Sequence, residues 1–197
     1  MRAENPFLES IGCPEFCDVV FSVVRVVDQN QRSLIQLFLL LPKSHTMSSK
    51  VVCVSGFFDP LHYGHVDALQ KAKALANQQS DGCEGTLFVL VNNDAQAKLK
   101  KGKVFMPCAE RCKMVRSLGC VDAVMEAPDT DRTVCRAIQA VHPDIFAIGL
   151  DLGEEYMKEE RELCQQMGVQ VVCPLGERIQ SSSSLIAAAA AAVPKKA

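Results

Sequence analysis

Short apolar runs alternate with longer amphipathic stretches along most of this chain, from Val51 onward. Alternation of this kind is typical of βα units, in which each strand of a parallel sheet is followed by a crossover helix. The sequence therefore predicts an α/β fold built on a parallel sheet.

The individual elements follow from the same pattern. Strands are predicted at Val51–Ser55, Thr86–Asn92, Val121–Met125, Asp144–Ile148 and Gln170–Cys173. Helices are predicted at Gly64–Asn77, Pro107–Leu118, Thr130–Val141 and Glu154–Met167. Pro107 suits a first helical turn, and Gly168 suits the end of a helix.

The length of the chain favours a single domain. With 197 residues, 48% of them hydrophobic, it can bury one substantial core. We assign residues 48–186 to this domain and residues 187–197 to an alanine-rich C-terminal tail. Four serines precede the alanines and are expected to cap a helix there.

Residues 1–47 form a poorly determined N-terminal extension. Its apolar runs, Val19–Val27 and Leu34–Leu41, could pair as a hairpin. An alternative hypothesis is that the natural protein starts at Met47, directly before the first convincing strand. Cys13 and Cys17 lie four residues apart, but no second Cys or His pair lies nearby at ligand spacing, so no zinc site is expected.

Composition narrows the possible partners and location. A net charge of -2 offers no overall field for a nucleic-acid backbone, so small phosphorylated ligands fit better. No run approaches the roughly 18 to 20 apolar residues that span a bilayer, so no membrane partner is expected. Several of the ten cysteines fall in apolar runs and are expected to be buried free thiols. Free thiols persist in a reducing compartment, so we expect the protein to be cytoplasmic.

Ten residues, Gly56–His65, carry the strongest chemical signal. They follow the first strand and open the first helix, where parallel α/β sheets bind phosphate. Gly56 and Gly64 allow a ligand to approach the main chain closely. His62 and His65 are three apart, so both imidazoles can face phosphate oxygens as N–H donors.

The pattern Gly-x-Phe-Asp-x-x-His-x-Gly-His resembles the signature of the cytidylyltransferase-like branch of the nucleotidyltransferase superfamily. The resemblance extends over roughly Val51 to Ile186. It implies a Rossmann-like parallel sheet with helices on both faces. It also implies that His62 and His65 are catalytic and contact the phosphates of a nucleoside triphosphate.

Further site residues follow from the same resemblance. Asn92 and Asp94, followed by a lysine-bearing loop, resemble the family's elements beside the phosphates, and Lys101 is the third catalytic candidate. Ser181–Ser183 resemble a Ser-Thr-Thr element that caps a late helix and grips the terminal phosphates. The full set of nucleotide-binding candidates is Gly56, Phe57, Phe58, Asp59, Gly64, Asn92, Asp94, Lys100, Lys103, Arg111, Gly149, Asp151, Gln180, Ser181, Ser182 and Ser183.

The chain departs from its apparent relatives where substrates are recognised. Phe57 is bulky where relatives tend to carry Thr or Cys. Ile148 and Leu150 stand where a polar residue and a second glycine often precede Asp151. Relatives that act on glycerol phosphate place an arginine before the serine element; this chain has none at that position, although Arg178 is close to it.

Two acidic groups keep alternative roles. Asp59 either fixes the loop or helps to hold magnesium. Asp129, Asp131 and Arg132 precede a predicted helix and either cap it or bind an acceptor, with the cap favoured.

The resemblance implies an enzyme of the nucleotidyltransferase class. It would transfer CMP or AMP from CTP or ATP, with Mg²⁺, to a small phosphorylated acceptor and release pyrophosphate. Glycerol phosphate, phosphoethanolamine, a heptose phosphate, phosphopantetheine and flavin mononucleotide remain open as acceptors, and a homodimer is implied.

Two alternatives compete with this function. One is a catalytically weak nucleotide-binding or regulatory protein that keeps the fold. The other, an aminoacyl-tRNA synthetase fragment, is disfavoured because the chain lacks the Lys-Met-Ser-Lys-Ser loop of those enzymes.

Overall fold

The structure is a computed structural model, and it describes residues 48–149 and 155–192. Several expectations lie outside these ranges: the N-terminal hairpin, the Cys13–Cys17 pair, Leu150, Asp151, the predicted helix start at Glu154 and the last residues of the tail. The account below concerns the described residues alone.

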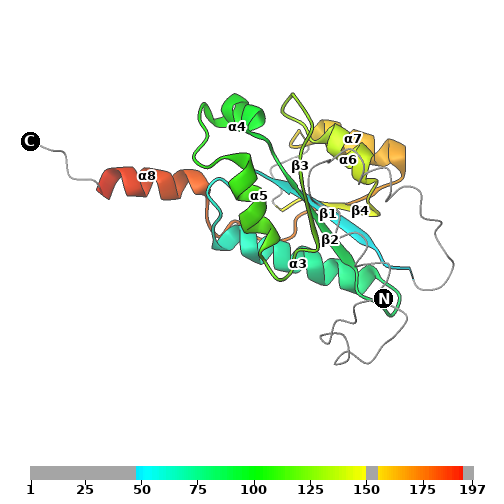
Figure 1. Cartoon of the computed structure of the whole chain (residues 1–197). Helices are drawn as coiled ribbons and strands as arrows, with labels where there is room; N and C mark the ends of the chain where they lie inside the picture. Colours follow the sequence, from blue (N-terminus) through cyan, green and yellow to red (C-terminus); the bar gives the residue numbers. More distant parts are fainter. Residues whose placement is uncertain (1–47, 150–154, 193–197) are drawn as a thin grey trace, which may run out of the picture. The chain divides into compact units, whose positions relative to one another are not determined.

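Five parallel strands form one sheet in the order β3-β2-β1-β4-β5 (Figure 1). The strands are β1 (Val51–Gly56), β2 (Thr86–Val91), β3 (Ala123–Glu126), β4 (Ile145–Ala147) and β5 (Gln170–Val172). In the central register Val54 of β1 pairs with Val89 of β2 and with Ala147 of β4. The predicted parallel α/β sheet is confirmed.

Helices cover both faces of this sheet. They are α3 (Tyr63–Gln79), α4 (Asp94–Lys101), α5 (Cys108–Arg116), α6 (Cys135–Val141), α7 (Lys158–Met167) and α8 (Ser182–Ala192). Alternate residues of β1 enter two separate cores, because successive side chains of a strand point to opposite faces. Val52 and Val54 pack with Leu69 of α3, whereas Cys53 packs with Ile138 of α6.

The sequence locates all five strands, and no strand end differs from its predicted position by more than two residues. Helix α3 extends slightly beyond its prediction at both ends. Pro107 is the residue before α5 rather than its first residue, and Gly168 ends α7 as expected. The buried Cys53 is a thiol, as its apolar surroundings predicted.

Helix α6 begins at Cys135, five residues after the predicted start at Thr130. The Asp129 carboxylate accepts hydrogen bonds from the backbone N–H groups of Arg136 (2.7 Å) and Ala137 (3.1 Å). It therefore caps the helix from a distance, as the favoured prediction had it. Asp131 accepts the backbone N–H of Thr133 (2.8 Å), and this bond holds the residues between Asp129 and α6 in a turn.

Helix α4 occupies a segment that the sequence assigned to a loop. Asn93 and Gln96 form a capping box: Oδ1 of Asn93 accepts the N–H of Gln96 (2.9 Å), and Oε1 of Gln96 accepts the N–H of Asn93 (3.1 Å). Gly102, in the left-handed region with φ 74°, ends the helix. Both the start signal and the stop signal are present in the sequence, but the lysine-rich segment between them was interpreted as a loop.

The strand order creates a topological switch point. The chain leaves β1 towards β2 on one side, and later crosses to β4 on the other side of β1. In open α/β sheets, ligands bind at the carboxyl ends of the strands at such a point. The sheet therefore places the candidate site directly after β1.

Among the helices of the described ranges, none is both long and apolar enough to cross a membrane.

Candidate functional site

The histidine pair lies at the entrance to α3. The rings of His62 and His65 are stacked, with centroids 3.7 Å apart and an interplanar angle of 18°. The backbone N–H of His62 donates to Nδ1 of His65 (3.3 Å), and the N–H of His65 donates to the carbonyl of His62 (2.9 Å). Because Nδ1 of His65 accepts this bond, the proton of its neutral ring is assigned to Nε2, where it can be donated to a ligand.

Both histidines are held in the neutral form. Burial, the neighbouring His62 and the Lys101 ammonium together lower the pKa of His65 to about 3. The pKa of His62 is lowered as well, chiefly by burial. Among the residues of the described ranges, Nδ1 of His62 is a buried nitrogen without a hydrogen-bond partner. Such unsatisfied groups cost about 1–3 kcal/mol and are typical of functional sites.

Phe58 packs behind the histidines. Its buried ring lies 5.0 Å from the ring of His65, and its backbone takes a positive φ of 51°. A Cβ atom at Gly56 would come within 2.9 Å of the Phe58 ring. Gly56 therefore serves the loop by leaving space for Phe58, which in turn supports His65.

We expect Gly56→Ala to lower the free energy of unfolding by about 1–3 kcal/mol, because the added methyl group overlaps the Phe58 ring. Urea unfolding measures this. Gly119→Ala is the matched control, since nothing lies within 4 Å of a Cβ at that glycine. Equal stabilities of the two variants would contradict the packing argument.

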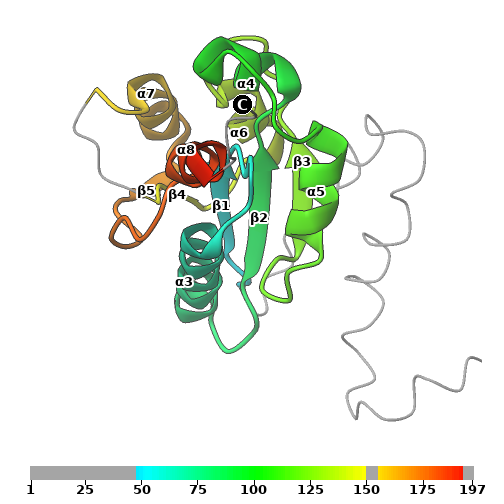
Figure 2. The ribbon, with the colours of Figure 1, turned by 90° about the vertical axis from the view of Figure 1, so that its left-hand side faces the viewer.

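Gly64 brings the last helix close to the histidine loop. A Cβ at Gly64 would lie 3.2 Å from the ring of His62 and 3.5 Å from the backbone nitrogen of Gln180. The hydroxyl of Ser182 donates to the carbonyl of Pro60 (2.9 Å). Figure 2 shows α8 beside the loop that leads from β1 into α3. The structure thus brings Gln180 and Ser182 to the histidine loop.

The serines have different local roles. Ser181 precedes α8, and its hydroxyl accepts the N–H of Ser184 (3.2 Å), so it caps the helix as predicted. Ser182 is buried against the loop, whereas Ser183 is exposed. Phosphate binding by these three residues stays a prediction.

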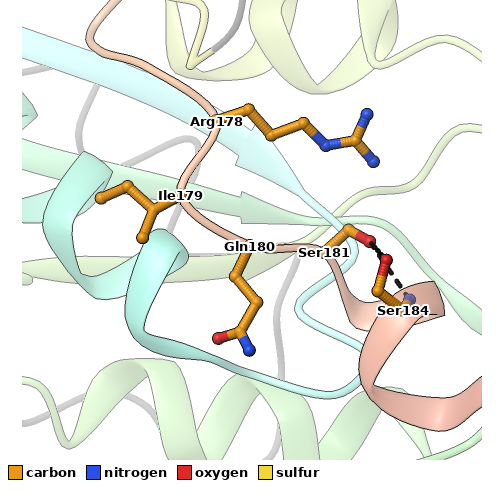
Figure 3. A pocket seen from close by; sticks show the side chains of 5 residues that line it. All are labelled: Arg178, Ile179, Gln180, Ser181 and Ser184. Carbon is orange, nitrogen blue, oxygen red and sulfur yellow. Dashed lines mark hydrogen bonds between the residues drawn. The ribbon is translucent and has the colours of Figure 1, made fainter. Parts of the chain in front are cut away.

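A hollow of about 310 Å³ lies at this helix start (Figure 3). It is lined by Arg178, Ile179, Gln180, Ser181 and Ser184. The side chains of Arg178 and Gln180 leave the chain on different sides, and the hydroxyls of Ser181 and Ser184 are 2.7 Å apart. Arg178 therefore joins the predicted serine element, although its sequence position alone did not make it a candidate.

Asp59 fixes the loop. Its carboxylate is 1% exposed and accepts the N–H groups of Phe105 (3.0 Å) and Met106 (2.8 Å). Its carbonyl accepts Nζ of Lys101 at 2.9 Å. Of its two predicted roles, the structure supports loop fixing, because both carboxylate oxygens are occupied by backbone donors.

The predicted lysines lie at the end of α4. Nζ of Lys100 and of Lys101 lie 4.8 and 5.4 Å from the centroid of the Phe57 ring. Burial is the main cause that lowers the pKa of each of these lysines. Lys103 lies beyond the helix and is exposed. The structure therefore brings Lys101 and Lys100 to the loop that carries the histidines.

Arg111 connects three segments of the site. It is fully buried, and its guanidinium donates to the carbonyls of Phe57 (2.7 Å), Asn92 (2.7 Å) and Met106 (2.8 Å). It also forms an ion pair with Asp94 at 2.7 Å. In this structure Arg111, Asn92 and Asp94 hold the loops around the site, while direct contact with a nucleotide stays a prediction for each of them.

Gln96 is a buried support that the sequence analysis did not single out. Its Nε2 donates to the carbonyls of Asp131 (3.0 Å) and Thr133 (2.6 Å), and its Oε1 accepts Nδ2 of Asn92 (3.1 Å). It thereby ties the end of β2 to the turn before α6. The capping box with Asn93 was the signal that could have found it.

The carboxyl end of β4 carries the remaining candidates. Ile148 is buried in the core beside Phe146, so this departure from the expected polar residue contributes packing. Gly149 is half-buried, and Asp151 lies outside the described residues. The homodimer stays a prediction.

The chain is similar to several known proteins. The family model described as Cytidylyltransferase-like matches residues 53–189. The bifunctional protein HldE of Helicobacter pylori (strain Shi470) is 33% identical over 147 residues, which cover 71% of this chain and 30% of that protein. HldE of Streptomyces coelicolor is 35% identical over 142 residues, which cover 71% of this chain and 28% of that protein.

The chain therefore spans less than a third of the length of these relatives. A crystal structure described as the lipopolysaccharide core biosynthesis protein from Thermoplasma volcanium GSS1 is 22% identical, with a TM-score of 0.47, over 64% of this chain and 93% of that one. The family match extends over most of the chain, from the first strand into α8. The chain belongs to the cytidylyltransferase-like family.

Proposed function

We propose that this protein is a nucleotidyltransferase that transfers CMP or AMP from CTP or ATP to a small phosphorylated acceptor. The observation that carries the proposal is the stacked pair of His62 and His65 after β1, with Lys101 and the start of α8 against the same loop. Family membership supports the reaction class.

In the proposed reaction, a phosphate oxygen of the acceptor attacks the α-phosphorus of the nucleotide. A new P–O bond forms, the bond from the α-phosphorus to the bridging oxygen breaks, and its electrons leave with pyrophosphate. An acceptor phosphate is already a competent nucleophile, so the enzyme contributes alignment and charge stabilisation.

The residues divide this work. Nε2–H of His65 donates to the transferring phosphate, and His62 acts beside it. Lys101 neutralises the charge that develops on the leaving group, and the serines before α8 bind the terminal phosphates. The pKa values of both histidines are lowered in the free protein, so the neutral rings meet the nucleotide as hydrogen-bond donors.

Mg²⁺ enters this proposal with the nucleotide, as the magnesium complex of the triphosphate. Asp59 does not fit a metal-ligand role, because its carboxylate is buried and accepts two backbone N–H groups. Within the ranges 48–149 and 155–192, no cluster of three or more His, Cys, Asp or Glu side chains is arranged to hold a metal ion. We therefore assign no step to a protein-bound metal.

A pyrophosphate-release screen tests the proposal. CTP and ATP are each crossed with glycerol phosphate, phosphoethanolamine, a heptose phosphate, phosphopantetheine and flavin mononucleotide. We expect one combination to release pyrophosphate well above the rate without acceptor.

Binding of CTP or ATP without pyrophosphate release from any pair would instead favour a nucleotide-binding or regulatory protein. The buried, apolar Ile148 at a recognition position is the observation that favours this second candidate.

We expect triphosphate binding to be coupled to proton uptake. The pKa of His65 in the free protein is about 3, so its ring is uncharged near neutral pH, and the negative charge of a bound triphosphate must raise that pKa. Protons are therefore taken up on binding, and the uptake grows as the pH falls through the raised pKa that His65 has in the complex.

Calorimetric titration in buffers of different ionisation enthalpy measures this uptake. The nucleotide also titrates near neutral pH, so the comparison is with His65→Asn, which binds the same ligand but lacks the titrating ring. Equal proton uptake by the two proteins would contradict the assignment.

A further inference from the structure

Phe57 presents an aromatic ring to two lysine ammonium groups. Nζ of Lys100 lies 4.8 Å from the ring centroid, and Nζ of Lys101 lies 5.4 Å from it. Both distances are within the roughly 6 Å over which the negative face of an aromatic ring attracts a cation. The ring is half-buried, so this attraction is partly shielded from water.

The two lysines repel each other. They are consecutive residues at the end of α4, and the charge of Lys100 contributes to the lowered pKa of Lys101. Two attractive contacts oppose the repulsion: the Phe57 ring, which both cations share, and the carbonyl of Asp59, which accepts Nζ of Lys101. Lys100 is exposed, so without its contact to the ring its repulsion from Lys101 is less opposed.

The backbone that carries the ring is itself fixed. Nη1 of the buried Arg111 donates to the carbonyl of Phe57 at 2.7 Å. On the other side of Phe57, Gly56 pairs within the sheet, and Phe58 packs against His65. The backbone on both sides of Phe57 is therefore fixed, with the lysines beside its ring.

We infer that Phe57 is a positioning residue that holds Lys100 and Lys101 together for the terminal phosphates of the nucleotide. The inference rests on the proposed function of this site, and it assigns to Phe57 the placement of Lys100, already a nucleotide-binding candidate, beside Lys101. Phe57 stands where the apparent relatives tend to carry Thr or Cys, so this role is specific to this chain. Its aromatic ring, in place of a small side chain, contacts both lysine ammonium groups.

Phe57→Leu and Phe57→Tyr test the inference, because leucine keeps apolar bulk without an aromatic face and tyrosine keeps the face. The first measurement is the NMR shift of the lysine methylene groups next to Nζ, which the ring current displaces. We expect the displacement to vanish for Lys100 and Lys101 in Phe57→Leu and to persist in Phe57→Tyr.

The second measurement is calorimetric binding of inorganic tripolyphosphate. Phe57→Leu is expected to bind about three- to tenfold more weakly, which is the range of one cation–π contact, and Phe57→Tyr about as tightly as the wild type. Lys98→Gln, at an exposed lysine of the same helix, controls for general loss of charge and is expected to change the affinity less than about twofold.

Unchanged lysine shifts in Phe57→Leu would overturn the inference, as would wild-type affinity of Phe57→Leu for tripolyphosphate. Neither measurement depends on turnover. If both give the expected result while no nucleotide and acceptor pair releases pyrophosphate, the platform for the lysines stands and the proposed reaction fails.

Discussion

Replacing His65 by alanine is expected to lower the rate of pyrophosphate release about a hundredfold or more. This is the usual loss when one preorganised transition-state donor is removed. The variant loses Nε2–H as a donor to the α-phosphate, and it also loses the ring that stacks on His62 at 3.7 Å. Steady-state pyrophosphate release with the nucleotide and acceptor found in the screen measures the effect.

His65→Asn separates chemistry from folding in this experiment. The asparagine carbonyl can accept the backbone N–H of His62, as Nδ1 of His65 does, but it places no donor where Nε2 lies. We expect His65→Asn to unfold like the wild type and to be as slow as His65→Ala. His142→Asn is the matched control, because His142 is exposed at the end of α6 and asparagine tolerates its left-handed backbone. Turnover of His65→Asn within about threefold of the wild type would remove His65 from the mechanism.

The sheet was predictable because its strands are dominated by local signals. β1 and β2 are short apolar runs rich in β-branched residues, and both are buried on two faces, so no other assignment accommodates them. The histidine motif was predictable for a related reason, since its residues are consecutive and its position after the first strand determines where it lies.

Helix boundaries depended on contacts that are distant in sequence. Asp129 caps α6 across a turn that Asp131 holds, and propensity alone cannot separate that turn from a first helical turn.

The roles of site residues also depended on partners that are distant in sequence. A carboxylate in a phosphate-binding motif suggests a metal ligand until the backbone of Phe105 and Met106 is seen to occupy it. The partners lie 46 and 47 residues further along the chain, where no motif signals them.

Arg111 gives the second large expected effect, and it concerns stability as well as function. The sequence made it a nucleotide-binding candidate, yet its side chain is fully buried. Its donors join the loop after β1, the end of β2 and the segment before α5 through the carbonyls of Phe57, Asn92 and Met106. Removing the guanidinium takes a donor from each of these carbonyls and from the Asp94 carboxylate, whose Oδ1 keeps only the backbone N–H of Cys108 (2.9 Å) among the hydrogen bonds of the described residues.

We therefore expect Arg111→Met to lower the free energy of unfolding by about 3 kcal/mol or more, at the lower end of the range for breaking a buried ion pair because the Asp94 side chain is 41% exposed. Urea unfolding measures the loss. Arg116→Met is the matched control. Arg116 lies on the same helix, is exposed and donates a long hydrogen bond of 3.3 Å to the carbonyl of Val124, so a change within about 0.5 kcal/mol is expected. If Arg111→Met were as stable as this control yet failed to bind nucleotide, Arg111 would be a direct ligand. A loss of stability would instead identify Arg111 as the residue that joins the histidine loop to α4, because its guanidinium holds both the backbone of Phe57 and the carboxylate of Asp94.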